Sequence, residues 1–231
     1  MIKTLIFGLD LSFSSTGITI SYLEDKIGKK IQFFKVIFDD ESNKKKQFVP
    51  KPIENLNQIT YKMPTNILVD DLIMDNENTN NLEQVTTTIK AMICSKKIGI
   101  IIRDAIKEFQ PNEIIYSIEN YIMPQFSGKN QLKTVSGLIM LQGFVREIVI
   151  RFSIESNIKL KIFTTTPSNN KLFFTKNGNA DKPTMIKSFI ENYEGLKLLP
   201  EISIEQTSKF NDVVDSFSLM MHGYSEYIKM K

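Results

Sequence analysis

The sequence has one cysteine, no long apolar run and little net charge, and each shortage excludes a class of protein. The single cysteine, Cys94, excludes an intramolecular disulfide framework and any zinc site built on several cysteines. No apolar run reaches membrane-spanning length, and Met1 leads directly into a strand-like segment. We therefore expect no signal peptide, no membrane anchor and a reducing, intracellular setting. A net charge of +3 is too small to indicate a nucleic-acid partner, so the placement of the lysines must decide.

What remains is the composition of a globular protein. The chain has 231 residues, of which 42% are hydrophobic and 24% charged, which is enough for one well-buried domain. Between about residues 39 and 81 the regular patterns stop, and this stretch contains three consecutive lysines and several prolines. We interpret it as an extended insert or mobile loop, with one short element near residues 67–74. The prediction is a single domain over residues 1–231.

Strand and helix patterns alternate along the rest of the chain. Strand patterns occupy residues 4–11, 17–23, 31–38, 113–118 and 159–163. Helical spacing covers residues 82–109 and 133–152, and helix starts follow at Thr166-Pro167, at Asp181-Lys182-Pro183 and at Asn211-Asp212. This order predicts an α/β domain with a mixed five-stranded sheet flanked by helices. Its first three strands form an antiparallel meander, and the last two are parallel.

Two aspartates in the last predicted helix are the most informative pair. Asp212 and Asp215 are three residues apart, so in a helix they lie on one face, about one turn from each other. Their neighbours, among them Val214 and Phe217, are typical of a core, where two acids carry a desolvation cost. A divalent cation would offset that cost.

Two further acids lie at the ends of predicted strands. Asp10 is near the end of the first strand, and Glu119 ends the fourth. If these strands are parallel neighbours, both acids lie at the carboxyl edge of the sheet. Such oxygen ligands suit Mg²⁺ or Mn²⁺ and not zinc. Two such ions could activate water and stabilise the leaving oxygen of a phosphodiester.

Each acid also has a structural explanation when it is taken alone. Asp10 could be a turn or cap residue, and Glu119 could mark the exit of its strand into solvent. Asp212 could be a first-turn residue favoured by the helix dipole. Asp215 is harder to explain in this way because apolar residues surround it. The combination is more informative than any single member.

The order of these acids and several local segments resembles the RuvC-like Holliday junction resolvases of the ribonuclease H-like superfamily. The segments concerned are Gly8-Leu9-Asp10-Leu11-Ser12, Ser15-Thr16-Gly17-Ile18, Phe109-Gln110-Pro111-Asn112-Glu113, Thr166-Pro167-Ser168 through Lys171, Asn177-Gly178-Asn179-Ala180-Asp181-Lys182 and Asn211-Asp212-Val213-Val214-Asp215-Ser216. The resemblance covers about residues 1–38 and 82–225. It implies a ribonuclease H-like fold.

The resemblance also implies roles for single residues. The catalytic, metal-binding acids would be Asp10, Glu119, Asp212 and Asp215, with two Mg²⁺ or Mn²⁺ ions per site. Lys171 and Lys182 would face the phosphate, with Lys182 among the catalytic residues. The residues alone allow another interpretation, in which both lysines belong to a solvated helix face.

One departure from the family concerns an aromatic residue. The family commonly has an aromatic three residues after the strand-end glutamate, to stack on junction bases, but Ile122 stands there. Tyr121 and Phe126 are the aromatic residues nearby that could bind DNA instead. Tyr121 could also be a core residue.

The leading hypothesis is a metal-dependent endonuclease that resolves four-way DNA junctions. The alternatives are another ribonuclease H-like nuclease acting on branched DNA or RNA–DNA hybrids, a DNA-binding protein without activity and, more distantly, an actin-like ATPase. Symmetric nicking needs two active sites, so the resemblance implies a homodimer. An apolar stripe in helix 133–152 (Leu138, Leu141, Val145 and Val149) could form its interface or be buried within the chain.

Overall fold

The computed structural model describes residues 2–24, 30–39, 56–63, 79–120, 129–194 and 211–231. Within these ranges one sheet of six strands has the order β4-β3-β2-β1-β5-β6. The strands are β1 (Lys3–Asp10), β2 (Ser15–Glu24), β3 (Lys30–Asp39), β4 (Leu56–Lys62), β5 (Glu113–Glu119) and β6 (Lys159–Thr165). The pairs β1–β2 and β2–β3 are antiparallel, whereas β1–β5 and β5–β6 are parallel. The predicted mixed α/β architecture is therefore confirmed.

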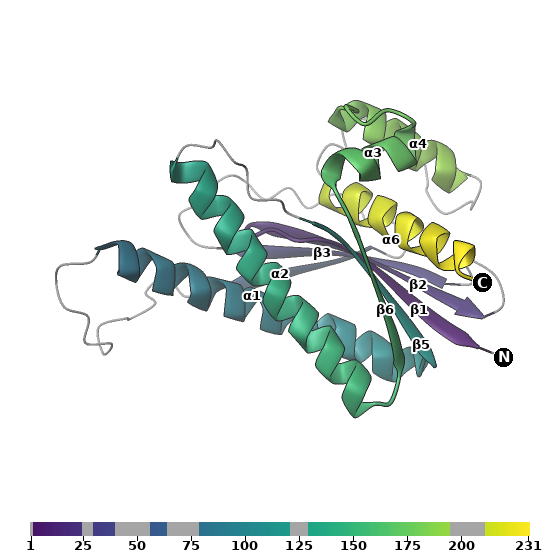
Figure 1. The fold of residues 1–231 in the computed structure, drawn as a ribbon, viewed down its shortest axis with the longest axis horizontal. Helices are drawn as coiled ribbons and strands as arrows, with labels where there is room; N and C mark the ends of the chain where they lie inside the picture. Colours follow the sequence, from purple (N-terminus) through teal and green to yellow (C-terminus); the bar gives the residue numbers. More distant parts are fainter. Residues whose placement is uncertain (1, 25–29, 40–55, 64–78, 121–128, 195–210) are drawn as a thin grey trace.

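Five helices in the described ranges cover the two faces of this sheet (Figure 1). They are α1 (Thr79–Phe109), α2 (Lys129–Glu155), α3 (Pro167–Thr175), α4 (Lys182–Glu194) and α6 (Asn211–Lys229). The long helices α1 and α2 pack on one face, and α6 lies on the other with α3 and α4 beside it. None of the helices in these ranges has both the length and the apolarity that crossing a bilayer requires.

The sixth strand is the main correction to the predicted sheet. β4 lies inside the stretch interpreted as an insert or loop, and it pairs in parallel with β3 at the edge of the sheet. It was missed because an edge strand alternates only weakly: its residues are half-buried or exposed rather than cleanly divided between two faces. The short element expected near residues 67–74 lies outside the described residues.

The two long helices also settle where the predicted apolar stripe lies. Leu141, Val145 and Val149 on α2 have no exposed surface and belong to the core between α1, α2 and the sheet, while Leu138 is half-buried. The interpretation in which the stripe is buried within the chain is confirmed. A homodimer would therefore need another surface.

Alternation along the central strands places the candidate acids on the α6 face. In β1, Leu5, Phe7 and Leu9 belong to the core against α1 and α2, so the even-numbered residues face α6. In β5, Tyr116 and Ile118 belong to that same core. Asp10 and Glu119 therefore both lie on the side of the sheet that α6 covers.

Two glycines let α6 approach the sheet closely. A Cβ atom on Gly8 would lie 2.1 Å from the carbonyl oxygen of Ser216, and one on Gly17 would lie 1.9 Å from that of Asp212. Real side chains cannot occupy these positions, so the main chain of α6 rests directly on β1 and β2. Because Asp10 pairs with Gly17, the first turn of α6 is held beside Asp10.

Candidate active site

The ends of β1 and β5 bring the first two acids together. Leu9 pairs with Ile118 in the parallel ladder, so the next residues along the two strands are Asp10 and Glu119. Both acids are half-buried and lie at the carboxyl edge of the sheet, as the sequence predicts. The order of the strands, rather than their distance in sequence, makes them neighbours.

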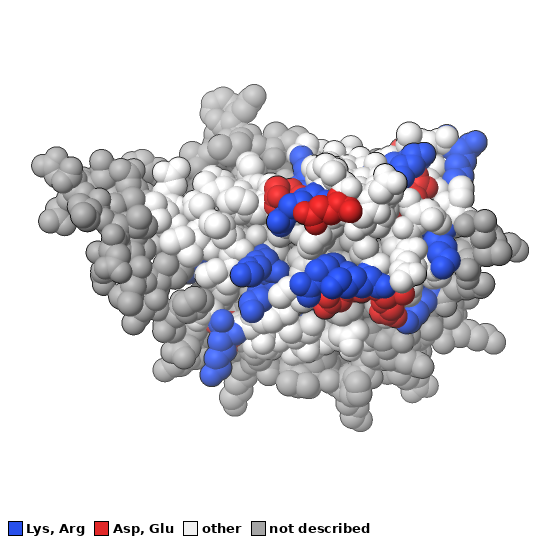
Figure 2. Space-filling model, turned by 90° about the horizontal axis from the view of Figure 1, so that it is seen from below, with Lys and Arg blue, Asp and Glu red and all other residues white. Residues whose placement is uncertain are grey.

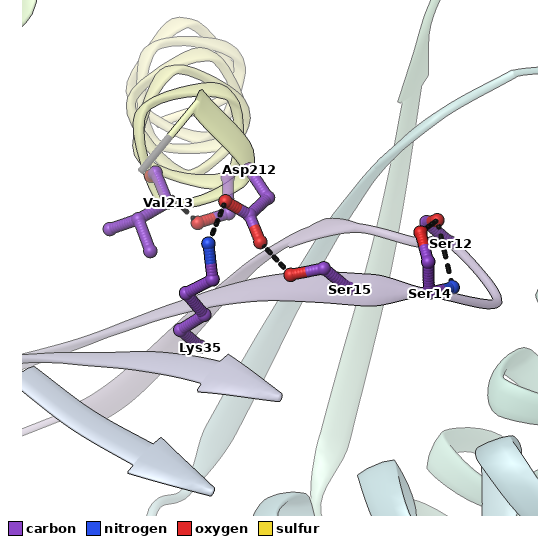
Figure 3. Close-up of polar contacts among 7 residues, drawn as sticks. Ser12, Ser14, Ser15, Lys35, Asp212 and Val213 are labelled. Carbon is purple, nitrogen blue, oxygen red and sulfur yellow. Dashed lines mark hydrogen bonds and ion pairs between the residues drawn. The ribbon is translucent and has the colours of Figure 1, made fainter. Parts of the chain in front are cut away.

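The N-terminus of α6 supplies the other two acids. Asp212 and Asp215 are both half-buried, and Asp212 is in the first turn of the helix. Figure 3 shows that both carboxylate oxygens of Asp212 already have partners. Ser15 Oγ donates a hydrogen bond to Oδ2, and Lys35 Nζ lies 3.4 Å from Oδ1. Asp212 thus ties α6 to β2 and β3.

Ser15 follows the turn between β1 and β2, which contains Ser12 and Ser14. Thr16 Oγ1 accepts a hydrogen bond from the backbone N–H of Ser12 at 3.1 Å and donates one to the Ser12 carbonyl at 3.0 Å. Ser12 Oγ also accepts from the backbone N–H of Ser14 at 3.3 Å (Figure 3). These local bonds fix the turn, and with it the start of β2 on which Ser15 lies.

The electrostatic effects show that the four acids form one cluster. Burial raises the pKa of Asp10 well above its usual value. The negative charges of Asp215, Glu119 and Asp212, in that order, raise the pKa of Asp10 further. Lys182 lowers it, but by less than any of these effects. Asp10 is therefore the acid whose pKa is raised by the charges of all three others.

Glu119 and Asp215 are also perturbed. Burial, followed by the charge of Asp215, raises the pKa of Glu119 to about 7, while a hydrogen bond from Asn170 and the charge of Lys171 oppose the shift. Burial raises the pKa of Asp215 to about 6, and Lys171 opposes this shift most strongly. Raised carboxyl pKa values of this kind are concentrated at functional sites, because burying acids close together does not help the protein to fold.

The donor set and its charge fit a divalent cation. The carboxyl groups offer hard oxygen ligands, and their mutual repulsion is what a dication between them would relieve. No group of three acids, histidines or cysteines in the described part of the chain is gathered closely enough to form a ready metal centre. The side chains of Asp10, Glu119 and Asp215 would therefore have to converge on a bound ion.

Both predicted lysines lie within electrostatic reach of these acids. Lys171 on α3 lowers the pKa of Glu119 and of Asp215. Lys182 at the start of α4 does so for Asp10 and Asp215. The start of α4 is fixed by Asp181, whose carboxylate accepts a hydrogen bond from the Thr184 backbone N–H at 3.0 Å. The structure thus brings both lysines to the acidic cluster.

Four further polar residues around the cluster were assigned no role from the sequence. Ser15 and Lys35 bind Asp212, Gln142 on α2 donates a hydrogen bond to the Glu119 carbonyl, and Asn170 donates one to its carboxylate. A lysine inside an apolar strand is the one signal that could have indicated Lys35. The predicted DNA-binding aromatics Tyr121 and Phe126 lie outside the described residues.

The raised pKa values predict that the metal-free protein loses stability as pH rises. Glu119 and Asp215 have pKa values of about 7 and about 6 in the folded protein, against usual values of 4.5 and 3.8. The folded state therefore binds more protons than the unfolded state. The resulting stabilisation is fully present below about pH 4 and is lost as pH rises through about 6 to 7. In EDTA, urea denaturation should give a lower free energy of unfolding at pH 8 than at pH 5, by on the order of 3 kcal/mol.

Glu119→Gln is the control for this effect, because glutamine keeps the shape but does not ionise. The variant should lose less stability than the wild type between pH 5 and pH 8. Millimolar Mg²⁺ should raise the stability of the wild type at pH 8 and leave that of the variant nearly unchanged. Identical pH dependence in the two proteins would contradict the raised pKa of Glu119.

Comparisons with known proteins give matches among solved structures only. No protein-family model and no curated protein matches the chain. Thermus thermophilus RuvC aligns over 98% of this chain and 96% of its own, with 13% identity and a TM-score of 0.45. The same protein in complex with a Holliday junction substrate aligns over 98% and 95%, with 13% identity and a TM-score of 0.46. The yeast mitochondrial Holliday junction resolvase Ydc2 aligns over 97% and 82%, with 9% identity and a TM-score of 0.39.

These three solved structures are thus a RuvC protein alone, the same protein with a Holliday junction substrate, and a mitochondrial Holliday junction resolvase.

Proposed function

We propose that this protein is a metal-dependent endonuclease that cuts four-way DNA junctions by phosphodiester hydrolysis. The main support is the cluster of half-buried carboxyl groups from β1, β5 and α6, which raise one another's pKa values at one edge of the sheet. Lys171 and Lys182 lie beside that cluster. A site with concentrated negative charge and flanking cations suits a metal-bound phosphodiester.

The roles within the site follow from charge and position. Asp10, Glu119 and Asp215 would hold Mg²⁺ or Mn²⁺ through carboxylate oxygens, and Asp212 would join them if it released Lys35. When bound, two such cations would activate water and stabilise the leaving oxygen. Lys171 and Lys182 would attract the scissile phosphate and offset the negative charge that develops on it.

The alternatives differ in how they fit the described chain. An actin-like ATPase needs two related lobes, whereas the described residues form one sheet with its helices. A nuclease acting on RNA–DNA hybrids or on other branched DNA would use the same acids, so geometry does not separate it from a junction resolvase. The choice of four-way junctions follows the resemblance of the motifs and of the solved structures.

A cleavage panel tests this proposal. Synthetic four-way junctions, forks, linear duplex of the same sequence and RNA–DNA hybrids are incubated with the protein and either Mg²⁺, Mn²⁺ or EDTA. We expect paired nicks in the four-way junction with metal and none with EDTA. Preferred cleavage of hybrids or forks would support the alternative nuclease. ATP turnover without cleavage of any substrate would contradict the nuclease assignment.

We propose further that a second copy of the chain docks on the outer face of α1 and α2, giving the homodimer that paired nicking requires. Met92 on α1 and Ile154 on α2 are 53% and 74% exposed. Figure 2 shows basic and acidic side chains next to each other on one face of the molecule. On α2, Arg151 pairs with Glu147 at 3.2 Å. A face with exposed apolar residues and charges of both signs can complement a copy of itself. A DNA-binding face would instead be expected to carry mainly positive charge.

Ile154→Asp tests the dimer, because it places a charge on the most exposed apolar residue among those of α2 whose side chains are described. Sedimentation equilibrium should show a dimer for the wild type and a monomer for the variant, with an unchanged circular dichroism spectrum. Leu172→Asp, on an α3 residue that is 52% exposed, is the matched control and should stay dimeric. A wild type that is monomeric at micromolar concentration overturns this interface.

A further inference from the structure

A buried polar pair connects α3 with α6 behind the acidic cluster. Asn170 is 1% exposed and Ser218 is fully buried, and Ser218 Oγ donates a hydrogen bond of 2.8 Å to Asn170 Oδ1. Both side chains lie where α3 and α6 otherwise contribute apolar residues such as Phe174 and Phe217. An apolar pair of similar size would be about as stable, because a buried hydrogen bond only offsets the desolvation of its partners. Fold stability alone therefore gives no reason for this pair.

The hydrogen bond from Ser218 fixes the orientation of the Asn170 amide. Since Oδ1 accepts from the serine hydroxyl, the amide group directs its N–H donors elsewhere. The Asn170 side chain lowers the pKa of Glu119 through a hydrogen bond, so an N–H of the amide faces that carboxylate. The result is a directed chain from Ser218 through Asn170 to Glu119. A flipped amide would present an oxygen to a carboxylate and repel it.

The backbone of α3 explains why Asn170 reaches Glu119. Glu119 pairs with Thr165 in the β5–β6 ladder, and the N–H of Asn120 donates to the Thr165 carbonyl at 2.7 Å. Thr166 then caps α3, and the N–H of Asn170 donates to the Thr166 carbonyl at 2.9 Å. Asn170 thus lies in the first helical turn after the strand that borders Glu119.

We propose that Asn170, oriented by Ser218, is a positioning residue that holds the Glu119 carboxylate for a divalent cation. This inference rests on the proposed metal-dependent function. One carboxylate oxygen bound by the amide leaves the other available to a cation, and a carboxylate fixed in one rotamer loses less conformational entropy on binding the ion. Gln142 holds the backbone of the same residue from the opposite face of the sheet, so main chain and side chain are fixed separately.

The test is a double variant, Asn170→Val with Ser218→Ala, which removes both members of the buried hydrogen bond, so that only the half-buried Glu119 carboxylate loses a donor. Its thermal midpoint should stay close to that of the wild type. Its affinity for Mn²⁺, measured by electron paramagnetic resonance without DNA, should fall about tenfold, the loss expected for one charge-assisted hydrogen bond. Junction cleavage at subsaturating Mn²⁺ should fall in parallel and recover at high Mn²⁺.

Ser216→Ala is the matched control. Ser216 is a fully buried serine of the same helix, but its hydroxyl lies 2.8 Å from Thr19 Oγ1 and is not connected to Asn170. This variant should keep the Mn²⁺ affinity of the wild type. Ser218→Ala alone should weaken Mn²⁺ binding by less than the double variant, because Asn170 can still donate but is no longer oriented.

The outcomes separate this inference from the proposed function. Wild-type Mn²⁺ affinity in the double variant, or an equal loss in Ser216→Ala, overturns the role of Asn170. A wild type that binds Mn²⁺ but cuts no junction overturns the proposed function while the affinity series still decides the role of Asn170. A wild type that binds no Mn²⁺ overturns both.

Discussion

Asp10→Asn is expected to reduce junction cleavage by at least about 10²–10³-fold, the loss typical when a preorganised charge-stabilising group is removed. The physical reason is that Asp10 has the strongest connection to the rest of the cluster: the charges of Asp215, Glu119 and Asp212 all act on it. Asparagine keeps the shape but cannot supply an anionic ligand, so cation binding should fail. Affinity for an intact four-way junction, measured in EDTA, should be unchanged because no phosphate contact is removed.

The same substitution should stabilise the metal-free protein at neutral pH. Burial and three negative neighbours disfavour the ionised form of Asp10, so a neutral side chain removes a repulsion that the wild type must tolerate. A higher urea midpoint together with lost cleavage would show that the charge of Asp10 destabilises the fold but is needed for cleavage. Lost cleavage with lower stability would instead indicate a damaged fold.

Two aspartates serve as comparisons for Asp10→Asn. Asp104→Asn removes an exposed acid that pairs with Arg103 at 3.0 Å, and it should leave cleavage unchanged. Asp212→Asn should reduce cleavage less than Asp10→Asn, because both oxygens of Asp212 are already bound by Ser15 and Lys35. An Asp212→Asn variant as inactive as Asp10→Asn would show that Asp212 leaves these partners to bind the metal.

Gly8→Ala is expected to lower the free energy of unfolding by about 3 kcal/mol, because the added Cβ overpacks a contact between two backbones. The new atom would lie 2.1 Å from the Ser216 carbonyl oxygen and 2.4 Å from the Met220 nitrogen. Neither is the flexible end of a side chain, so α6 as a whole must move away from β1. Cleavage should fall as well, since α6 carries Asp215 away from Asp10. Chemical denaturation and the cleavage assay measure the two losses.

Gly143→Ala is the matched control for this substitution. Gly143 is an exposed residue inside α2, and a Cβ built on it meets nothing within 4 Å. Alanine favours a helix by about 1 kcal/mol over glycine, so this variant should be more stable than the wild type. If Gly8→Ala lowers and Gly143→Ala raises the free energy of unfolding, the close approach of α6 to the sheet explains the loss, and the removal of a glycine does not. Equal effects would refute the packing argument.

The sequence predicted the parts of the fold that local patterns determine. The meander, the parallel strands after Pro111 and the helix starts at Thr166 and Asp181 all follow from alternation, proline and capping residues. β4 escaped prediction because its partner β3 stabilises it more than its own weak alternation does. Its parallel register is a long-range property that no local pattern encodes.

The positions of the candidate acids were predictable from the sequence, whereas their hydrogen-bond partners were not. Asp10 and Glu119 could be placed because strand ends are visible in the sequence, and Lys171 and Lys182 because their segments resemble a known motif. The hydrogen bonds of Ser15, Lys35 and Asn170 join residues from different elements, and only the packing of α3 and α6 against the sheet creates them. Such contacts between distant parts of the chain produce no residue spacing that could be recognised in the sequence.

The close packing of α6 on β1 and β2 determines which substitutions would change the geometry of the acidic cluster. At Gly8 and Gly17 the contact is between main chains, which are the same in every amino acid. The separation between Asp10 and the acids of α6 therefore depends on contacts between backbones, and not on which side chains fill either core. Substitutions at Gly8 and Gly17 would change this separation directly.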